Sequence, residues 1–188
     1  MKKTVLTFGL ISGAFLSAMM LMTLPFQDAI GHGTRGMVVG YTTMVLAFLL
    51  VFFGVRSYRD NVAGGTVRFG RAFAVGALIA GLASLCYVAT WEVYYYTAKP
   101  DFIAKYQAYQ LEKERANGAT PEAIARKKVE LDKFAEMYKN PAINAAMTLL
   151  EPLPVALIVA LVTAGVLSRR KKAPLGGDGV LAGARNSR

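Results

Sequence analysis

The chain has 188 residues, of which 54% are hydrophobic and 18% charged, and its mean hydropathy is +0.37. An ordinary soluble domain has about 45–50% apolar and about 25% charged residues, so these values exclude that class. The formal net charge is +10. Basic residues are not interleaved with aromatic ones as in nucleic-acid-binding segments, so we expect no nucleic acid partner.

Four apolar blocks, at about residues 4–24, 36–55, 73–96 and 147–167, dominate the sequence. Each supplies about 20 residues, enough to cross about 30 Å of hydrocarbon as a helix. The first block follows two lysines like a secretion signal, but it is too long and no small-x-small cleavage site follows it. We expect it to be retained. The sequence predicts an all-α integral membrane bundle of four transmembrane helices within a membrane domain of residues 1–172.

Small residues recur every four positions in three of the blocks. Such faces let helix backbones approach closely in lipid. They predict close packing within the chain, and a homo-oligomer interface is the alternative. The three sets are Gly9, Gly13 and Ser17; Gly76, Ala80 and Ser84; and Ala156, Ala160 and Ala164.

A basic loop separates the second and third blocks and sets four arginines against one acid, Asp60. Short loops rich in Lys and Arg stay in the cytoplasm during insertion. We therefore expect a multi-pass protein of the bacterial inner (plasma) membrane with both termini cytoplasmic. The arginines are also predicted to contact anionic lipid headgroups, as a simple anchor or as a specific lipid or phosphate site. They are Arg56, Arg59, Arg68 and Arg71.

Between the third and fourth blocks, at about residues 98–140, the composition changes to charged and amphipathic. Segments 101–117 and 121–139 have helical apolar stripes and are separated by Gly118, with Thr120 placed as an N-cap. They predict an extramembrane helical hairpin. This hairpin is either a cap over its own bundle or a docking surface for an envelope protein.

Two carboxylates, Glu92 and Glu151, lie inside the predicted spans. Ionisable groups are costly there and commonly mark a functional site. Glu151 precedes two prolines, whose missing N–H groups leave helical carbonyls free, so it is a candidate cation or proton site. Arg35 and His32 are expected near the same outer end. A structural ion-pair cluster of these four residues is therefore the alternative.

The sequence contains no recognisable catalytic motif. Cys86 has no catalytic partner within its block, Gly64-Gly65 lacks the lysine of a P-loop, and one histidine cannot make a histidine metal cluster. We therefore expect no enzymatic activity, no cofactor and no metal.

The central part of the chain contains a distinctive set of fragments. They are Gly36-Met37, Gly40-Tyr41, Met44, VFFGVRSYRD from Val51 to Asp60, Gly64-Gly65, FGRAF from Phe69 to Phe73, and Tyr87 to Tyr95 with Thr90-Trp91-Glu92. Together they resemble a bacterial family of small multi-span membrane proteins, domain of unknown function 4199. The resemblance covers roughly Val5 to Leu167 and implies no activity or ligand. Residues 173–188 are predicted to be a disordered basic tail outside it.

Taken together, these features favour a structural or interaction component of the cell envelope. The alternative is a small transporter, or an ion- or proton-coupled membrane component, that acts as an oligomer through Glu92 and Glu151. Ionisable groups facing a cavity would distinguish the second function from the first.

Overall fold

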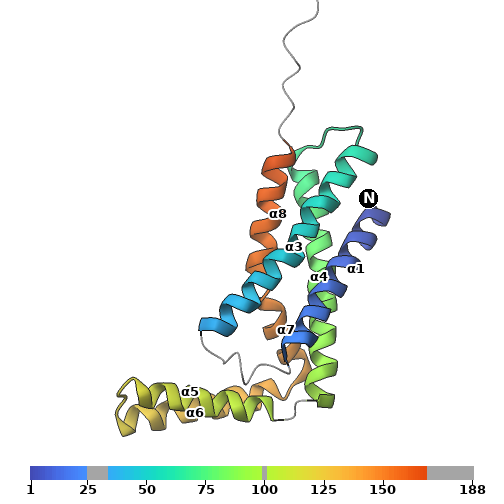
Figure 1. Ribbon diagram of the computed structural model, residues 1–188. Helices are drawn as coiled ribbons and strands as arrows, with labels where there is room; N and C mark the ends of the chain where they lie inside the picture. The colour runs from blue at the N-terminus through green and yellow to red at the C-terminus, as the bar shows by residue number, and fades with distance from the viewer. Residues whose placement is uncertain (25–33, 99–100, 169–188) are drawn as a thin grey trace, which may run out of the picture.

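The computed structural model of the chain describes residues 1–24, 34–98 and 101–168, and every regular element within these ranges is a helix. The long helices stand side by side, and two shorter ones lie across one end of them (Figure 1). The helices are α1 (Lys2–Thr23), α3 (Thr34–Asn61), α4 (Phe69–Ala98), α5 (Phe102–Ala116), α6 (Pro121–Tyr138), α7 (Pro141–Leu150) and α8 (Leu153–Leu167).

Three of the helices, α1, α3 and α4, are individually long and apolar enough to cross a membrane. The pair α7 and α8 meets the same criterion only jointly, which gives three spans, or four if the bent pair is one span. The 15 residues of α8 cover about 22 Å, short of the about 30 Å of a hydrocarbon core. A fourth crossing therefore needs both helices.

The fourth predicted span, 147–167, is not one continuous helix. It begins earlier, at Pro141, and bends by 40° between α7 and α8. Glu151 is the C-cap of α7, and Pro152 is the N-cap of α8. Pro152 and Pro154 lack the N–H groups that would continue the hydrogen-bond ladder, so the helix breaks where they enter it.

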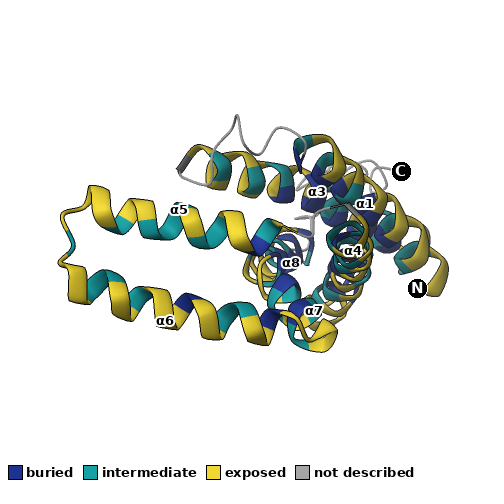
Figure 2. Cartoon of the chain, turned by 90° about the horizontal axis from the view of Figure 1, so that it is seen from below, coloured by how far each residue is buried: buried dark blue, intermediate teal, exposed yellow. Residues whose placement is uncertain are grey.

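The interior of the bundle is formed where α1, α3, α4 and α8 contact one another. Its largest fully buried apolar side chains are Leu16, Phe48, Val51, Val55 and Ile79. Figure 2 shows buried residues on the faces that the helices turn toward one another and exposed residues on the outer faces. The outer faces of the long helices are rich in exposed Leu, Ile, Val and Phe, which suits contact with lipid.

Small residues bring α1 and α4 close together. A Cβ atom added to Gly13 would lie 2.7 Å from Cys86 Cβ, so these two helices meet there without room for a side chain. The Ser12 hydroxyl donates to the Ala47 carbonyl at 2.8 Å and ties α1 to α3. On α8, Ala160 and Ala164 are fully buried. The small-residue faces are thus used for packing within the chain.

The start of α1, the loop between α3 and α4, and the end of α8 all lie at one end of the bundle, and the hairpin lies at the other (Figure 1). In the loop, Gly64 and Gly65 have φ values of +69° and +86°. Only glycine adopts this left-handed region readily, so the pair allows the sharp reversal from α3 to α4.

Two helices, α5 and α6, form where the sequence predicts a helical hairpin; they run antiparallel across the end of the bundle and extend beyond it (Figures 1 and 2). The Thr120 hydroxyl accepts the Ala123 N–H at 3.3 Å and caps α6 as expected. Tyr106 and Phe134 bring the apolar stripes of the two helices together, with ring centroids 5.9 Å apart.

Candidate functional site: a pocket beneath the helical hairpin

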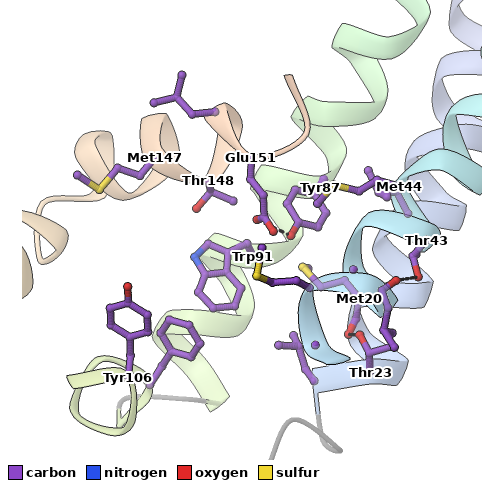
Figure 3. Close-up of a pocket in the computed structure, with 18 of the residues that line it drawn as sticks. Met20, Thr23, Thr43, Met44, Tyr87, Trp91, Tyr106, Met147, Thr148 and Glu151 are labelled. Carbon is purple, nitrogen blue, oxygen red and sulfur yellow. Dashed lines mark hydrogen bonds between the residues drawn. The ribbon is translucent and has the colours of Figure 1, made fainter. Parts of the chain in front are cut away.

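A pocket of about 590 Å³ lies where the hairpin meets the bundle. The end of α1, the start of α3, the second half of α4, both hairpin helices and α7 contribute to its wall, which continues to the α7–α8 break (Figure 3). Most of the lining is apolar. It includes four methionines, Met20, Met37, Met44 and Met147, and six aromatic residues, Tyr87, Trp91, Phe102, Tyr106, Phe134 and Tyr138.

One carboxylate opens into this pocket, that of Glu151. The Tyr87 hydroxyl donates to Glu151 Oε2 at 3.1 Å, across from α4 to the break between α7 and α8 (Figure 3). The described lining contains no Lys, Arg or His. Within that part of the chain, therefore, Glu151 faces a neutral phenol rather than a basic partner.

A second polar group lies beside the pocket, centred on Trp91. The indole Nε1–H is shared between Tyr138 Oη at 3.1 Å and Asn144 Oδ1 at 3.0 Å, and Thr148 Oγ1 donates to the same Asn144 oxygen at 3.2 Å. These contacts join α4, α6 and α7 and hold the aromatic wall in place. Burial raises the pKa of Tyr138 above its ordinary value, against a lowering by hydrogen bonds with Thr148 and Trp91, so the phenol stays protonated near neutral pH.

The amide of Asn144 is fully buried, and its Nδ2 has no hydrogen-bond partner among the described residues. The orientation of the amide is fixed by Trp91, because an indole N–H requires an acceptor and must face the oxygen. The structure thus leaves two amide hydrogens directed at no acceptor within that part of the chain.

The structure separates the residues that the sequence grouped at the outer end. Glu151 lines the pocket, whereas the half-buried Glu92 on α4 does not. The Oε1 atom of Glu92 is buried and has no hydrogen-bond partner within the described ranges. Arg35 is exposed in the first turn of α3, and His32 lies outside the described residues. Among the residues described, no ion pair involves either carboxylate.

The four loop arginines lie at the opposite end of the bundle from the pocket. Asp60 is shared between Arg59, whose Nε is 2.7 Å from Oδ1, and Arg56, whose Nε is 3.7 Å from Oδ2. Arg68 and Arg71 are exposed at the start of α4. This loop is therefore a separate basic surface with no part in the pocket.

Sequence reasoning selected Glu151 but not the neighbours that define its site. Tyr87 and Trp91 are four residues apart and share one face of α4, while Asn144, Thr148 and Glu151 follow at helical spacing on α7. The polar stripe on the otherwise apolar α7 is the signal that could have identified Asn144 and Thr148.

Comparison with known proteins adds a family and no activity. The family described as Protein of unknown function (DUF4199) matches residues 7–169. No curated protein matches the chain. No solved structure matches it either.

Proposed function

Because this chain belongs to the family Protein of unknown function (DUF4199), a description that assigns no activity, we propose its function from the pocket itself. The protein binds a small solute at the hairpin end of a membrane-embedded bundle and serves in transport or ion coupling through Glu151. Glu92 is the other intramembrane carboxylate, and we assign it no contact with the solute.

The observation that carries this proposal is the position of Glu151 at the break between α7 and α8, in the wall of the pocket. A carboxylate in a membrane span is expensive to keep, so its retention commonly reflects a function. Transporters commonly build their substrate and ion sites where spanning helices are broken, because irregular backbone is tolerated there beside a cavity. The Tyr87 hydroxyl supports the carboxylate without neutralising its charge.

Four helices enclose only a narrow path, so the transporting unit of this proposal is an oligomer in the bacterial inner membrane. Both termini and the arginine loop face the cytoplasm, where Arg56, Arg59, Arg68 and Arg71 contact anionic headgroups. The start of α1, the loop between α3 and α4, and the end of α8 lie at one end of the bundle, which supports this orientation (Figure 1).

Flux measurements in liposomes test the proposal. Purified protein is reconstituted with an internal pH-sensitive dye, and the decay of an imposed proton or cation gradient is followed. We expect faster decay with the wild type than with Glu151→Gln, and wild-type rates for Glu92→Gln, whose carboxylate lies outside the pocket. Equal rates for wild type and Glu151→Gln, together with no solute binding in the pocket, would overturn the proposal.

A structural or interaction role in the envelope is the second candidate, and the shape of the hairpin favours it. Helices α5 and α6 extend past the bundle (Figure 1), and Val129 and Met137 expose apolar side chains on α6. Photo-crosslinking in cells from position 129, with position 166 on the exposed face of α8 as control, tests this role. A discrete protein adduct from 129 alone supports it, and equal labelling from both positions contradicts it.

A further inference from the structure

We propose that the solute bound in the pocket is a lipophilic organic cation, an ammonium-type centre carrying aromatic or alkyl groups. This inference rests on the proposed function and specifies its ligand. Charge, wall chemistry and size each point to the same class of ligand.

The charge of the described lining has one sign. Glu151 supplies a carboxylate, and no basic side chain among those residues opposes it. Tyr87 is its one hydrogen-bond partner there, and a phenol O–H is a weaker partner for a carboxylate than a cation. A positive group entering the pocket would therefore find an incompletely compensated negative charge in a mostly apolar surrounding, where charge attraction is strong.

The aromatic wall suits a cation of low hydration. Trp91 lies 4.9 Å from Phe102 between ring centroids, and Phe134 lies 5.4 Å from Tyr138. The faces of such rings attract organic cations, and indole does so most strongly. Figure 3 shows Tyr87, Trp91 and Glu151 extending toward a common space, so one ligand could meet a ring and the carboxylate together.

The methionines and the size of the pocket point to an organic molecule. Flexible, polarisable methionine side chains fit ligands of varied shape. The volume of about 590 Å³ lies within the range of about 300–1,000 Å³ that holds drug-sized molecules.

A bare metal cation would require a different set of ligands. Calcium takes about 6–8 oxygen ligands and magnesium about six. The described lining offers one carboxylate, and its other side-chain oxygens are neutral hydroxyls of Thr and Tyr residues. The residues described include no group of three or more His, Cys, Asp or Glu able to hold a metal.

Trp91 provides a direct assay, because it is the only tryptophan in the chain and lines the pocket. In detergent solution free of lipid, its fluorescence is titrated with tetraphenylphosphonium and with tetraphenylborate, which have nearly the same shape and opposite charge. We expect saturable changes with the cation and none with the anion. Glu151→Gln should weaken cation binding by about tenfold or more, since a charged partner is lost from an apolar site.

Two further variants control for folding. Glu151→Asp keeps the charge and should retain binding, and Glu92→Gln, next to Trp91 but outside the pocket, should match the wild type. Equal affinity for both probes, or an unchanged affinity in Glu151→Gln, would overturn the cationic assignment and leave the solute-binding function standing. Failure of both charged probes and of neutral aromatic solutes to bind at Trp91 would overturn the two proposals together.

The ammonium centre could belong to a free solute or to a zwitterionic lipid headgroup, and competition distinguishes them. Both sources carry the same chemistry. Displacement of tetraphenylphosphonium by short-chain phosphocholine at lower concentration than by tetraalkylammonium salts identifies a lipid, and the reverse order identifies a free cation. If neither competitor displaces the probe, the shared ammonium chemistry is wrong.

Discussion

The single indole N–H of Trp91 is shared between two acceptors on two different helices, so this residue connects three helices at the hairpin end of the bundle. It donates to Tyr138 on α6 and to Asn144 on α7. Either acceptor alone would satisfy the donor. A buried donor is costly only when it loses its last partner, so loss of one of these hydrogen bonds still leaves the indole N–H satisfied by the other.

We predict that Tyr138→Phe and Asn144→Leu together destabilise the protein by more than the sum of the single variants. Each single change leaves Trp91 one acceptor and should cost about 1 kcal/mol. The double change strands the indole N–H and should add about 1 kcal/mol of coupling. Thermal unfolding in detergent measures this cycle. Strict additivity would show that the indole is satisfied by another group.

Sequence alone could identify Glu151 at this scale because a carboxylate within an apolar run stands out. It could not identify Tyr87 as its partner, which is 64 positions away. That pairing depends on how far α7 is displaced by the bend and which face of α4 it meets. Tyrosines and tryptophans near a span end also have an ordinary explanation, as an interfacial belt, so their presence was no signal of a site.

Among the elements, α1 and α4 pack at Gly13 without room for a side chain. We predict that Gly13→Ala costs about 1–3 kcal/mol, because the new Cβ would lie 2.7 Å from Cys86 Cβ and 2.8 Å from its Sγ. Gly81→Ala on α4 is the matched control, since nothing lies within 4 Å of its added Cβ. It should be neutral or stabilising by up to about 1 kcal/mol.

Detergent unfolding of the two glycine variants decides the point. A cost for Gly13→Ala no greater than that for Gly81→Ala would mean that α1 and α4 shift apart freely. The small-residue repeat predicted which face of α1 is buried, because it leaves one stripe of the helix without large side chains. It could not name α4 as the partner, since three blocks carry similar stripes.

We attribute the break between α7 and α8 to Pro152 and Pro154. We predict that Pro152→Ala with Pro154→Ala reduces the 40° bend, because restored N–H groups can bond the carbonyls of Thr148 and Leu150. Straightening would also move Glu151 from Tyr87 and weaken solute binding.

Spin labels at positions 146 and 158, on a Cys86→Ala background, measure this straightening. In a straight helix these positions are separated by about 18 Å along the axis, and we expect the variant to approach that separation. Pro141→Ala is the control, since Pro141 occupies the first turn of α7, where its missing N–H breaks no helical hydrogen bond. An unchanged distance in the double variant would assign the bend to packing instead.

The presence of the long apolar helices was predictable because apolar composition over about 20 residues is itself the physical requirement for a span. The predicted span 147–167 differed from the structure. Its composition is apolar throughout, but two prolines lack the N–H groups that a continuous helix needs. Helices α3 and α4 are longer than the predicted blocks: α3 continues to Asn61, and α4 already begins at Phe69. Their polar ends continue the helices past the apolar blocks and place Arg59 and Arg71 on helical turns.

At the scale of the whole molecule, the basic loop and the helical hairpin lie at opposite ends of the bundle (Figure 1). The arginine loop, the start of α1 and the end of α8 lie at one end, and the hairpin with the pocket lies at the other (Figure 1). From the positive-inside rule we expect the first end to be cytoplasmic, and we therefore propose that the pocket lies at the outer face of the membrane. A solute would then enter the site from outside.

Topology reporters test this arrangement as a whole. We predict that a reporter active only in the cytoplasm works after Lys172 and near Gly64, and is silent at Gly118 in the hairpin turn. Gly64 and Gly118 both have positive φ in turns, so insertion at either should disturb no helix. Activity at Gly118 alone would show that the orientation is the reverse, with the pocket at the cytoplasmic face. Activity near Gly64 alone, with silence both at Gly118 and after Lys172, would show that α7 and α8 form a re-entrant pair rather than one bent span. Arg68 lies just before α4 and Arg71 lies in its first turn. Replacing both with glutamate should raise the activity of the reporter at Gly118 if their charge sets the orientation.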